Sequence, residues 1–116
     1  MRTFGEVDAV VADVRAERNR QISGEGWGPE HDDRHDKGEM AMAAACYAAP
    51  ERVFVAHEIV GRGYEPMISY TDAWPWEDRW WKPKDRRRDL VRAAALIIAE
   101  IERLDRAARK AAPVEE

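Results

Sequence analysis

Cysteine is almost missing from this sequence: Cys46 is the only one among 116 residues. A single thiol cannot close a disulfide within the chain, which fits a reducing compartment. Long apolar runs are missing too, because the longest, at residues 93–99, is far too short to span a bilayer. The first residues reach an acidic side chain at Glu6 and lack the apolar core of a signal peptide. We therefore expect a cytoplasmic protein that does not enter a membrane.

An excess of positive charge is also missing, since the formal net charge is -4 at pH 7. Domains dedicated to nucleic-acid binding usually carry a positive excess, so we do not expect that function. The sequence has no glycine-rich phosphate loop, nucleophile elbow or paired-cysteine motif. Its 45% apolar and 36% charged residues are typical of a globular chain, and its length favours one domain. We predict a single domain over residues 1–112 and a frayed tail over residues 113–116.

The spacing of apolar residues predicts a first helix from residue 4 to about residue 22, ended by Gly24 and Gly26. One side of this helix is apolar and the other is charged, which predicts one buried stripe. The expected buried residues are Phe4, Val7, Val10, Val11, Val14, Ile22 and the stem of Arg18. The expected outward residues are Glu6, Asp13, Glu17 and Arg20.

Two further helices are predicted. Residues 39–49 are rich in alanine, the best helix former, so this helix should be central and closely packed, with Cys46 as a small buried side chain. The last helix starts at Pro83 or Asp85 and is apolar nearly all round in its middle, so it is buried inside the domain or in a homo-oligomer. One of its stripes consists of Leu90, Ala94, Ile97, Ile101 and Leu104, and the second of Val91, Ala95 and Ile98.

Between these helices, residues 52–70 contain two β-rich runs around Gly61 and Gly63, with Pro66 confining the second run to a sheet edge. The predicted fold class is therefore mainly α: a three-helix single domain with a small β-hairpin or irregular insertion.

The polar run at residues 24–38 is the first candidate site. It is rich in glycine, so we expect little regular structure there, and its side chains are those that bind polar ligands or metals. The spacing of His31 and His35 places both on one face if the run closes into a helical turn. Together with Glu30, Asp32 and Asp33 they could hold a ligand, or His31, Asp32 and His35 a divalent metal. In the simpler interpretation these groups only cap the next helix and bond to loop amides.

Four of the five tryptophans lie in the second unusual run, at residues 74–83. Rings of this kind usually pack an irregular segment onto a helical core. Trp27 and one of Trp76, Trp80 or Trp81 could also sandwich a planar group by stacking.

A basic cluster follows at the start of the last helix, where free backbone amides already favour anions. Lys82, Arg86 and Arg87 could bind phosphate there. The simpler default is that these cations pair with the acidic run and hold it against the helix, which would also bring the two unusual segments together.

Much of the chain resembles a family of small phage and prophage proteins. The likeness rests on residues 18–21, on the run Glu-Gly-Trp-Gly-Pro-Glu-His-Asp-Asp-Arg-His at 25–35, on residues 38–47, and on residues 74–76, 80–83 and 87–97. Residues 50–73 lie outside it. The resemblance implies a viral or mobile-element origin and the cytoplasm of a bacterial host. Because the family is largely uncharacterised, it implies no particular activity.

Gly26-Trp27, residues 29–33 and His35, following a first helix, are also similar to the ryanodine-receptor repeat domain. This chain departs from that repeat because Lys37 follows His35 and the Leu-Val-Pro-Tyr segment is missing. The likeness implies a compact helical module with a polar ligand cleft and transfers no ligand.

The sequence leads us to expect a non-enzymatic, phage-type binding protein for a small anionic, nucleotide-derived molecule, for example to sequester a signal of bacterial immunity. We expect no cofactor, no catalytic residue and no resident metal. One alternative is a metal-dependent nucleotide hydrolase built on His31, Asp32, Asp33 and His35. A second is an adaptor that binds a host protein through exposed aromatic residues. The expected ligand-binding residues are Trp27, Glu30, His31, Asp32, Asp33, His35, Trp81, Lys82, Arg86 and Arg87.

Overall fold

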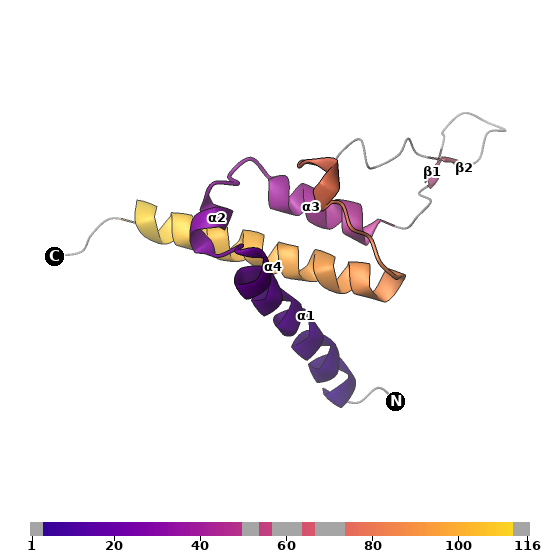
Figure 1. The fold of residues 1–116 in the computed structure, drawn as a ribbon, viewed down its shortest axis with the longest axis horizontal. Coiled ribbons are helices and arrows are strands. Elements are labelled where there is room, and N and C mark those ends of the chain that lie inside the picture. Colours follow the sequence, from indigo (N-terminus) through magenta and orange to yellow (C-terminus); the bar gives the residue numbers. More distant parts are fainter. Residues whose placement is uncertain (1–3, 50–53, 57–63, 67–73, 113–116) are drawn as a thin grey trace.

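The computed structural model describes residues 4–49, 54–56, 64–66 and 74–112. These residues form a mainly α fold, as the sequence predicts. They contain four α-helices, one more than expected, because the polar run after the first helix closes into a short helix of its own. The helices are α1 (Phe4–Glu25), α2 (Pro29–Asp33), α3 (Glu39–Ala48) and α4 (Arg86–Ala111), and a 3₁₀ turn at Asp78–Trp80 precedes α4 (Figure 1).

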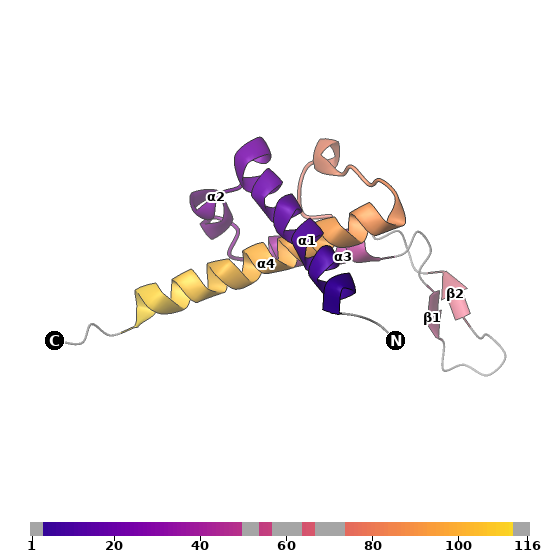
Figure 2. The same ribbon diagram turned by 90° about the horizontal axis from the view of Figure 1, so that it is seen from below.

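The other helices are arranged around α4. α1, α2 and α3 all contact it, and Figure 1 shows α3 running beside α4 while α1 crosses it. The turned view in Figure 2 shows the same crossing. Small side chains on α3 and α4 let the two backbones approach closely, so α3 is the closely packed helix that its alanine content predicts. The main core cluster consists of Ala43, Ala44, Cys46, Tyr47, Trp74, Ala93 and Leu96.

Glycine, proline and aspartate set the helix ends. Gly26, just after α1, has a φ of 76°, in the left-handed region that favours glycine. Pro29 occupies the start of α2, where a backbone N–H would have no partner within the helix, so its absence costs no hydrogen bond. Asp85, one of the two predicted starts, caps α4, and its carboxylate accepts a 2.9 Å hydrogen bond from the backbone N–H of Arg88.

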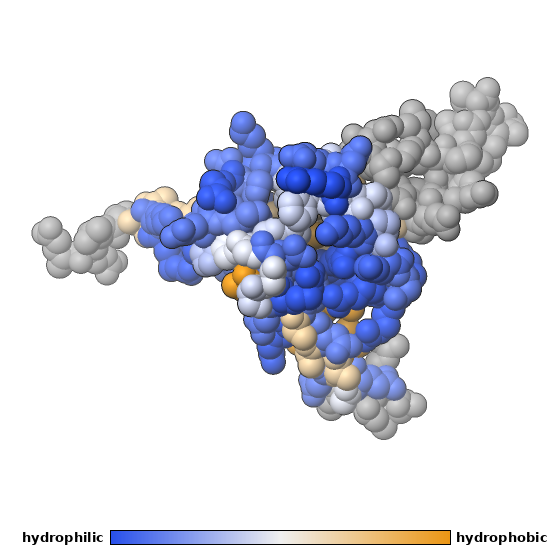
Figure 3. All heavy atoms as spheres, in the orientation of Figure 1, coloured by the Kyte–Doolittle hydropathy of each residue, from blue (hydrophilic) through white to orange (hydrophobic). Residues whose placement is uncertain are grey.

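The predicted buried face of α1 is right only in part. Val14 and Arg18 are buried, as expected, but Val7, Val10, Val11 and Ile22 are exposed. The helix buries a mostly polar face, made of Val14, Glu17, Arg18 and Gln21. Burial of this face is possible because guanidinium groups from α1 and α4 neutralise the carboxylate of Glu17. Figure 3 shows the result from one side, where the few hydrophobic residues gather mainly over α1 on a largely hydrophilic surface.

The two predicted apolar stripes of α4 differ in burial. The second stripe is buried at Val91 and Ala95, which pack with Val14 of α1. The first stripe is exposed except at Ala94, which is half-buried against that cluster. Ile98 of the second stripe is exposed, at 38%. The large exposed residues of the first stripe are Leu90, Ile97, Ile101 and Leu104.

The predicted insertion, either a small β-hairpin or an irregular segment, contains a short pair of β-strands. β1 (Phe54–Ala56) pairs antiparallel with β2 (Tyr64–Pro66), with Val55 opposite Glu65. Pro66 lies at the end of β2, opposite Phe54. The predicted glycine turn at residues 61–63 and the predicted tail at residues 113–116 lie outside the described residues.

Candidate functional site

The two unusual runs of the sequence meet through their aromatic rings. Trp27, just after α1, stacks on His31 of α2 with ring centroids 5.6 Å apart and planes 9° from parallel. His31 contacts His35 edge to face at 4.7 Å. Trp76, from the second run, lies 5.9 Å from Trp27 and 5.4 Å from His35. The four rings therefore form a closed cluster that joins residues far apart in the sequence.

Backbone and ion-pair contacts fix Trp27 and α2 beside α1. The backbone N–H of Trp27 donates to the carbonyl of Gln21 at 2.9 Å, and its own carbonyl accepts from Arg18 at 3.2 Å. The guanidinium of Arg18 also donates to the carboxylate of Asp32 at 2.7 Å and to that of Glu102 at 2.8 Å. One buried arginine thus ties α2 and α4 to α1.

Each histidine is oriented by a carboxylate. Nδ1 of His31 lies 2.9 Å from the carboxylate of Asp32, and Nδ1 of His35 lies 3.1 Å from that of Glu39. Burial by itself raises the pKa of Glu39, but hydrogen bonds from His35 and from backbone N–H groups outweigh it and hold the pKa below its ordinary value. No hydrogen bond from the described part of the chain reaches the Nε2 atom of either ring. Both Nε2 atoms are therefore available to an incoming polar group.

An open groove of about 540 Å³, which we call the aromatic groove, lies against this cluster. A volume of this size is within the range of small-molecule sites. The indole Nε1 of Trp76 is buried and donates to no acceptor within the described ranges. The groove is lined by Glu25, Trp27, His31, His35, Pro75, Trp76, Glu77 and Trp80.

A smaller, basic recess shares Glu25, Trp27 and Trp80 with the aromatic groove. Its volume of about 30 Å³ corresponds to one water molecule. Two of its polar atoms, Oε1 of Gln21 and Nε of Arg92, make no hydrogen bond with any residue the structure describes. The cations that line it are Arg20, Lys82 and Arg92.

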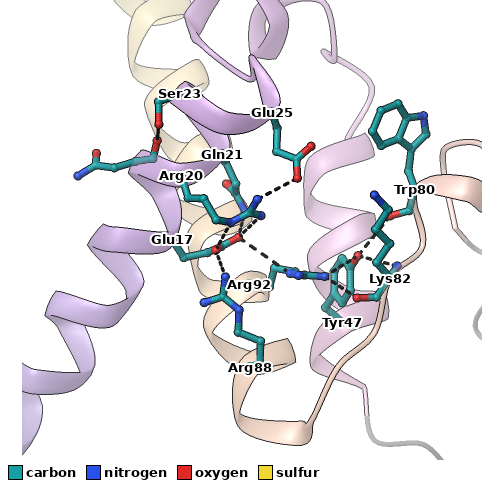
Figure 4. A network of polar contacts seen from close by, with 11 residues as sticks. Glu17, Arg20, Gln21, Ser23, Glu25, Tyr47, Trp80, Lys82, Arg88 and Arg92 are labelled. Carbon is teal, nitrogen blue, oxygen red and sulfur yellow. Dashed lines mark hydrogen bonds and ion pairs between the residues drawn. The ribbon is translucent and has the colours of Figure 1, made fainter.

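Behind the recess lies a network centred on Glu17, a residue expected on the outward face of α1 (Figure 4). The Glu17 side chain is fully buried and accepts from Arg20 at 2.7 and 2.9 Å and from Arg88. Nε of Arg92 lies 4.0 Å from the same carboxylate. Burial raises the pKa of Glu17, but the hydrogen bond from Arg20 and the positive charges of Arg20, Arg88 and Arg92 outweigh it and lower the pKa overall.

Tyr47 of α3 joins this network to the tryptophan run and was not predicted. Its hydroxyl accepts from the backbone N–H of Lys82 at 3.2 Å and donates to the carbonyl of Trp80 at 3.4 Å. Its ring lies 4.8 Å from that of Trp81, which places Trp81 against the core rather than in the groove. The only sequence signal for Tyr47 is a large aromatic residue within an alanine-rich helix.

The carboxylates of the polar run are held by arginines. Asp32 is 1% exposed and pairs with Arg18. Asp33 accepts from Arg106 of α4 at 2.9 and 3.0 Å, and that hydrogen bond is the largest cause of its lowered pKa. Glu30 is exposed on α2. Over the described ranges, no group of three or more His, Cys, Asp or Glu side chains is arranged to hold a metal ion.

The predicted phosphate-binding residues lie in different places. Lys82 lines the basic recess, and its ammonium stands 5.6 Å from the ring centroid of Trp80, which the recess shares with the groove. Arg79 stands over the same ring at 5.0 Å. Arg86 donates to the carbonyl of Ala49 and Arg87 to the carboxylate of Asp13, so neither contacts the acidic run. Arginine pairing with the acidic run does occur, but through Arg18 and Arg106 instead.

No family model matches this chain, and no curated protein or solved structure matches it either. None of the described helices is long and apolar enough to cross a membrane.

Proposed function

We propose that this protein binds a small, planar, nucleotide-derived ligand in the aromatic groove and does so without chemical turnover. The observation that carries the proposal is the groove wall itself, in which three indole rings and two imidazole rings surround a space of small-molecule size. Stacking on aromatic side chains is worth about 1–3 kcal/mol per base and accepts any base, because every base has a π-face.

Hydrogen-bonding atoms at the groove fit a polar ring. Nε2 of His31 and Nε2 of His35 make no hydrogen bond with the described residues, so a base edge or sugar can pair with them. These atoms favour a nucleobase-like ligand over a plain hydrocarbon.

The charge distribution supports binding of the anionic part of the ligand at the Trp80 end of the groove. Glu25 and Glu77 line the groove and would repel a phosphate next to them. Lys82 and Arg79 both lie over the ring of Trp80, and Lys82 also lines the basic recess. In this arrangement the ring stacks inside the groove and the phosphate contacts Lys82, with no part for Arg86 or Arg87.

The ion pairs of Asp32 and Asp33 with arginines support binding without turnover. A hydrolase built on the polar run needs Asp32 and Asp33 as ligands or bases, and both carboxylates are already paired with arginines. Together with the resemblance to phage proteins, this supports capture of a nucleotide signal made by a bacterial host.

Native mass spectrometry of the purified protein with cyclic nucleotides and ADP-ribose derivatives tests the proposal. We expect a complex that carries the intact mass of one of these compounds. A bound divalent ion with product masses growing over time would favour the hydrolase. A co-purifying host protein with no small-molecule complex would favour the adaptor.

A groove variant sharpens the test. Trp80 is 37% exposed, so Trp80→Leu should leave the fold intact while removing one stacking surface. We expect at least about a tenfold loss of affinity, which corresponds to 1.4 kcal/mol, measured by titration of the best compound in that panel. Met42→Ala, at an exposed apolar residue of α3 outside the groove, is the matched control and should bind like the wild type. Equal affinity of all three proteins would rule out the groove.

A further inference from the structure

We infer that two copies of this chain associate through the exposed stripe of α4, with the two α4 helices antiparallel. The surface involved shares no residue with the lining of the aromatic groove. The inference therefore stands independently of the proposed ligand.

The exposed stripe of α4 has the spacing of a coiled-coil seam. Its members follow one another at alternating intervals of four and three residues, and none of them is charged. This spacing keeps a seam facing a second helix that packs at a small angle. The four large members are each 42–52% exposed. The stripe consists of Leu90, Ala94, Ile97, Ile101, Leu104 and Ala108.

The exposed face of α1 widens this surface. A hollow of about 400 Å³ between the two helices brings Val10, Val11 and Ile22 of α1 together with Ile98 of α4. Val7 lies one turn before Val11 and is 51% exposed. With the stripe, these residues place nine large apolar side chains, each about 40–50% exposed, on neighbouring parts of α1 and α4. A stable interface buries about 800 Å² per partner around an apolar centre, and this surface supplies such a centre.

The stripe is complementary in size to its own reversed sequence, which is why we assign a second copy as the partner. When two α4 helices run antiparallel with Ile97 facing Ile101, each alanine of one copy meets a leucine of the other. Ala94 then faces Leu104, and Ala108 faces Leu90. The four outer layers pair a large side chain with a small one and the two central layers pair isoleucine with isoleucine, which fills the seam. A twofold axis makes both halves of the interface equivalent, as in most dimers.

Parallel association fits less well. It would set alanine against alanine and leucine against leucine in the same layers.

Sedimentation velocity of the full chain at micromolar concentration tests the association. We expect the wild type at twice its chain mass of 13.3 kDa. Ile101→Glu and Leu104→Glu, each at a residue 52% exposed, should sediment as folded monomers with unchanged helical circular dichroism. Met42→Glu, at a residue of α3 that is 44% exposed and lies outside the stripe, should remain a dimer. A monomeric wild type, or a Met42→Glu variant that dissociates as fully as Ile101→Glu, overturns the inference.

Disulfide trapping tests the orientation. In a Cys46→Ser background, Ala94→Cys and Leu104→Cys variants are mixed and oxidised. We expect a cross-linked product from the mixture and little from either variant alone, because equivalent positions lie far apart along an antiparallel pair. Efficient cross-linking of each variant with itself contradicts the antiparallel arrangement.

Discussion

Glu17 is a buried carboxylate at the contact between α1 and α4. Its carboxylate is removed from water and faces three guanidinium groups, from Arg20 on its own helix and from Arg88 and Arg92 on α4. Burying a lone carboxylate is prohibitive, but a buried carboxylate held by several cations becomes a strong constraint on the two helices. The network therefore determines how α1 is rotated against α4.

Glu17→Gln keeps the size of the side chain and removes its charge. The free energy of unfolding should fall by about 3 kcal/mol, because Arg88 and Arg92 are left without their counter-ion. Asp13→Asn removes the exposed ion pair with Arg87 and should cost less than about 1 kcal/mol. Urea unfolding followed by circular dichroism compares the two. If both variants lose the same stability, the buried network does not determine how α1 packs against α4.

The sequence could not predict the burial of Glu17 or Gln21. Helical periodicity identifies the apolar side of a helix, and in α1 that side holds Val7, Val10 and Val11. Whether a polar side can be buried depends on cations that approach from a helix more than seventy residues away, and no local pattern records them. The opposite holds for Asp85 and Gly26, whose roles as cap and terminator depend only on neighbouring residues and are confirmed.

At the scale of elements, α2 is held by charge rather than by apolar burial. It has five residues and one buried side chain, that of Asp32. Helices of this length are not stable alone, so their contacts determine whether they form. Arg18 and Arg106 hold its two aspartates, and Pro29 starts it at a fixed φ. The sequence correctly marks residues 24–38 as an unusual polar run. The arginines predicted to pair with it are Arg86 and Arg87, whereas Arg18 and Arg106 are the ones that do.

Asp32→Asn and Asp33→Asn compare the contributions of the two ion pairs that hold α2. Asp32→Asn leaves the buried guanidinium of Arg18 with a weaker partner and should lower the free energy of unfolding by about 3 kcal/mol. Asp33→Asn acts at a more exposed carboxylate, so its effect on unfolding should be much smaller. Thermal unfolding is the measurement. An Asp33→Asn variant that is the less stable of the two would reverse this order.

At the scale of the whole molecule, the helices are joined by an alanine-rich core and by ion pairs between helices. Arg18 pairs with Glu102, Arg87 with Asp13, Arg88 with Glu17 and Arg106 with Asp33. Small side chains bury little apolar area each, so charge contributes more to this fold than to a leucine-rich one. The sequence predicted the helical class and the close packing of α3. It also predicted that the two unusual runs meet, but through cations of the second run rather than through the aromatic rings that join them. It did not predict which faces of α1 and α4 remain open, because that depends on the angle at which they cross.

This dependence on charge predicts sensitivity to acid. The pKa of Glu17 is lower in the folded protein than its ordinary value of 4.5, and so the folded state binds its proton less readily than the unfolded state does. The stabilisation is therefore complete above about pH 5 and is lost as the pH falls through 4.5 toward the folded pKa. One linked carboxylate contributes up to about 1.4 kcal/mol per pH unit within that window. Urea unfolding at a series of pH values from neutral to acid should show a steep loss in the wild type and in Asp13→Asn. The loss should be shallower in Glu17→Gln, because the amide has no proton to bind, and an unchanged slope in that variant would place the acid sensitivity elsewhere in the chain.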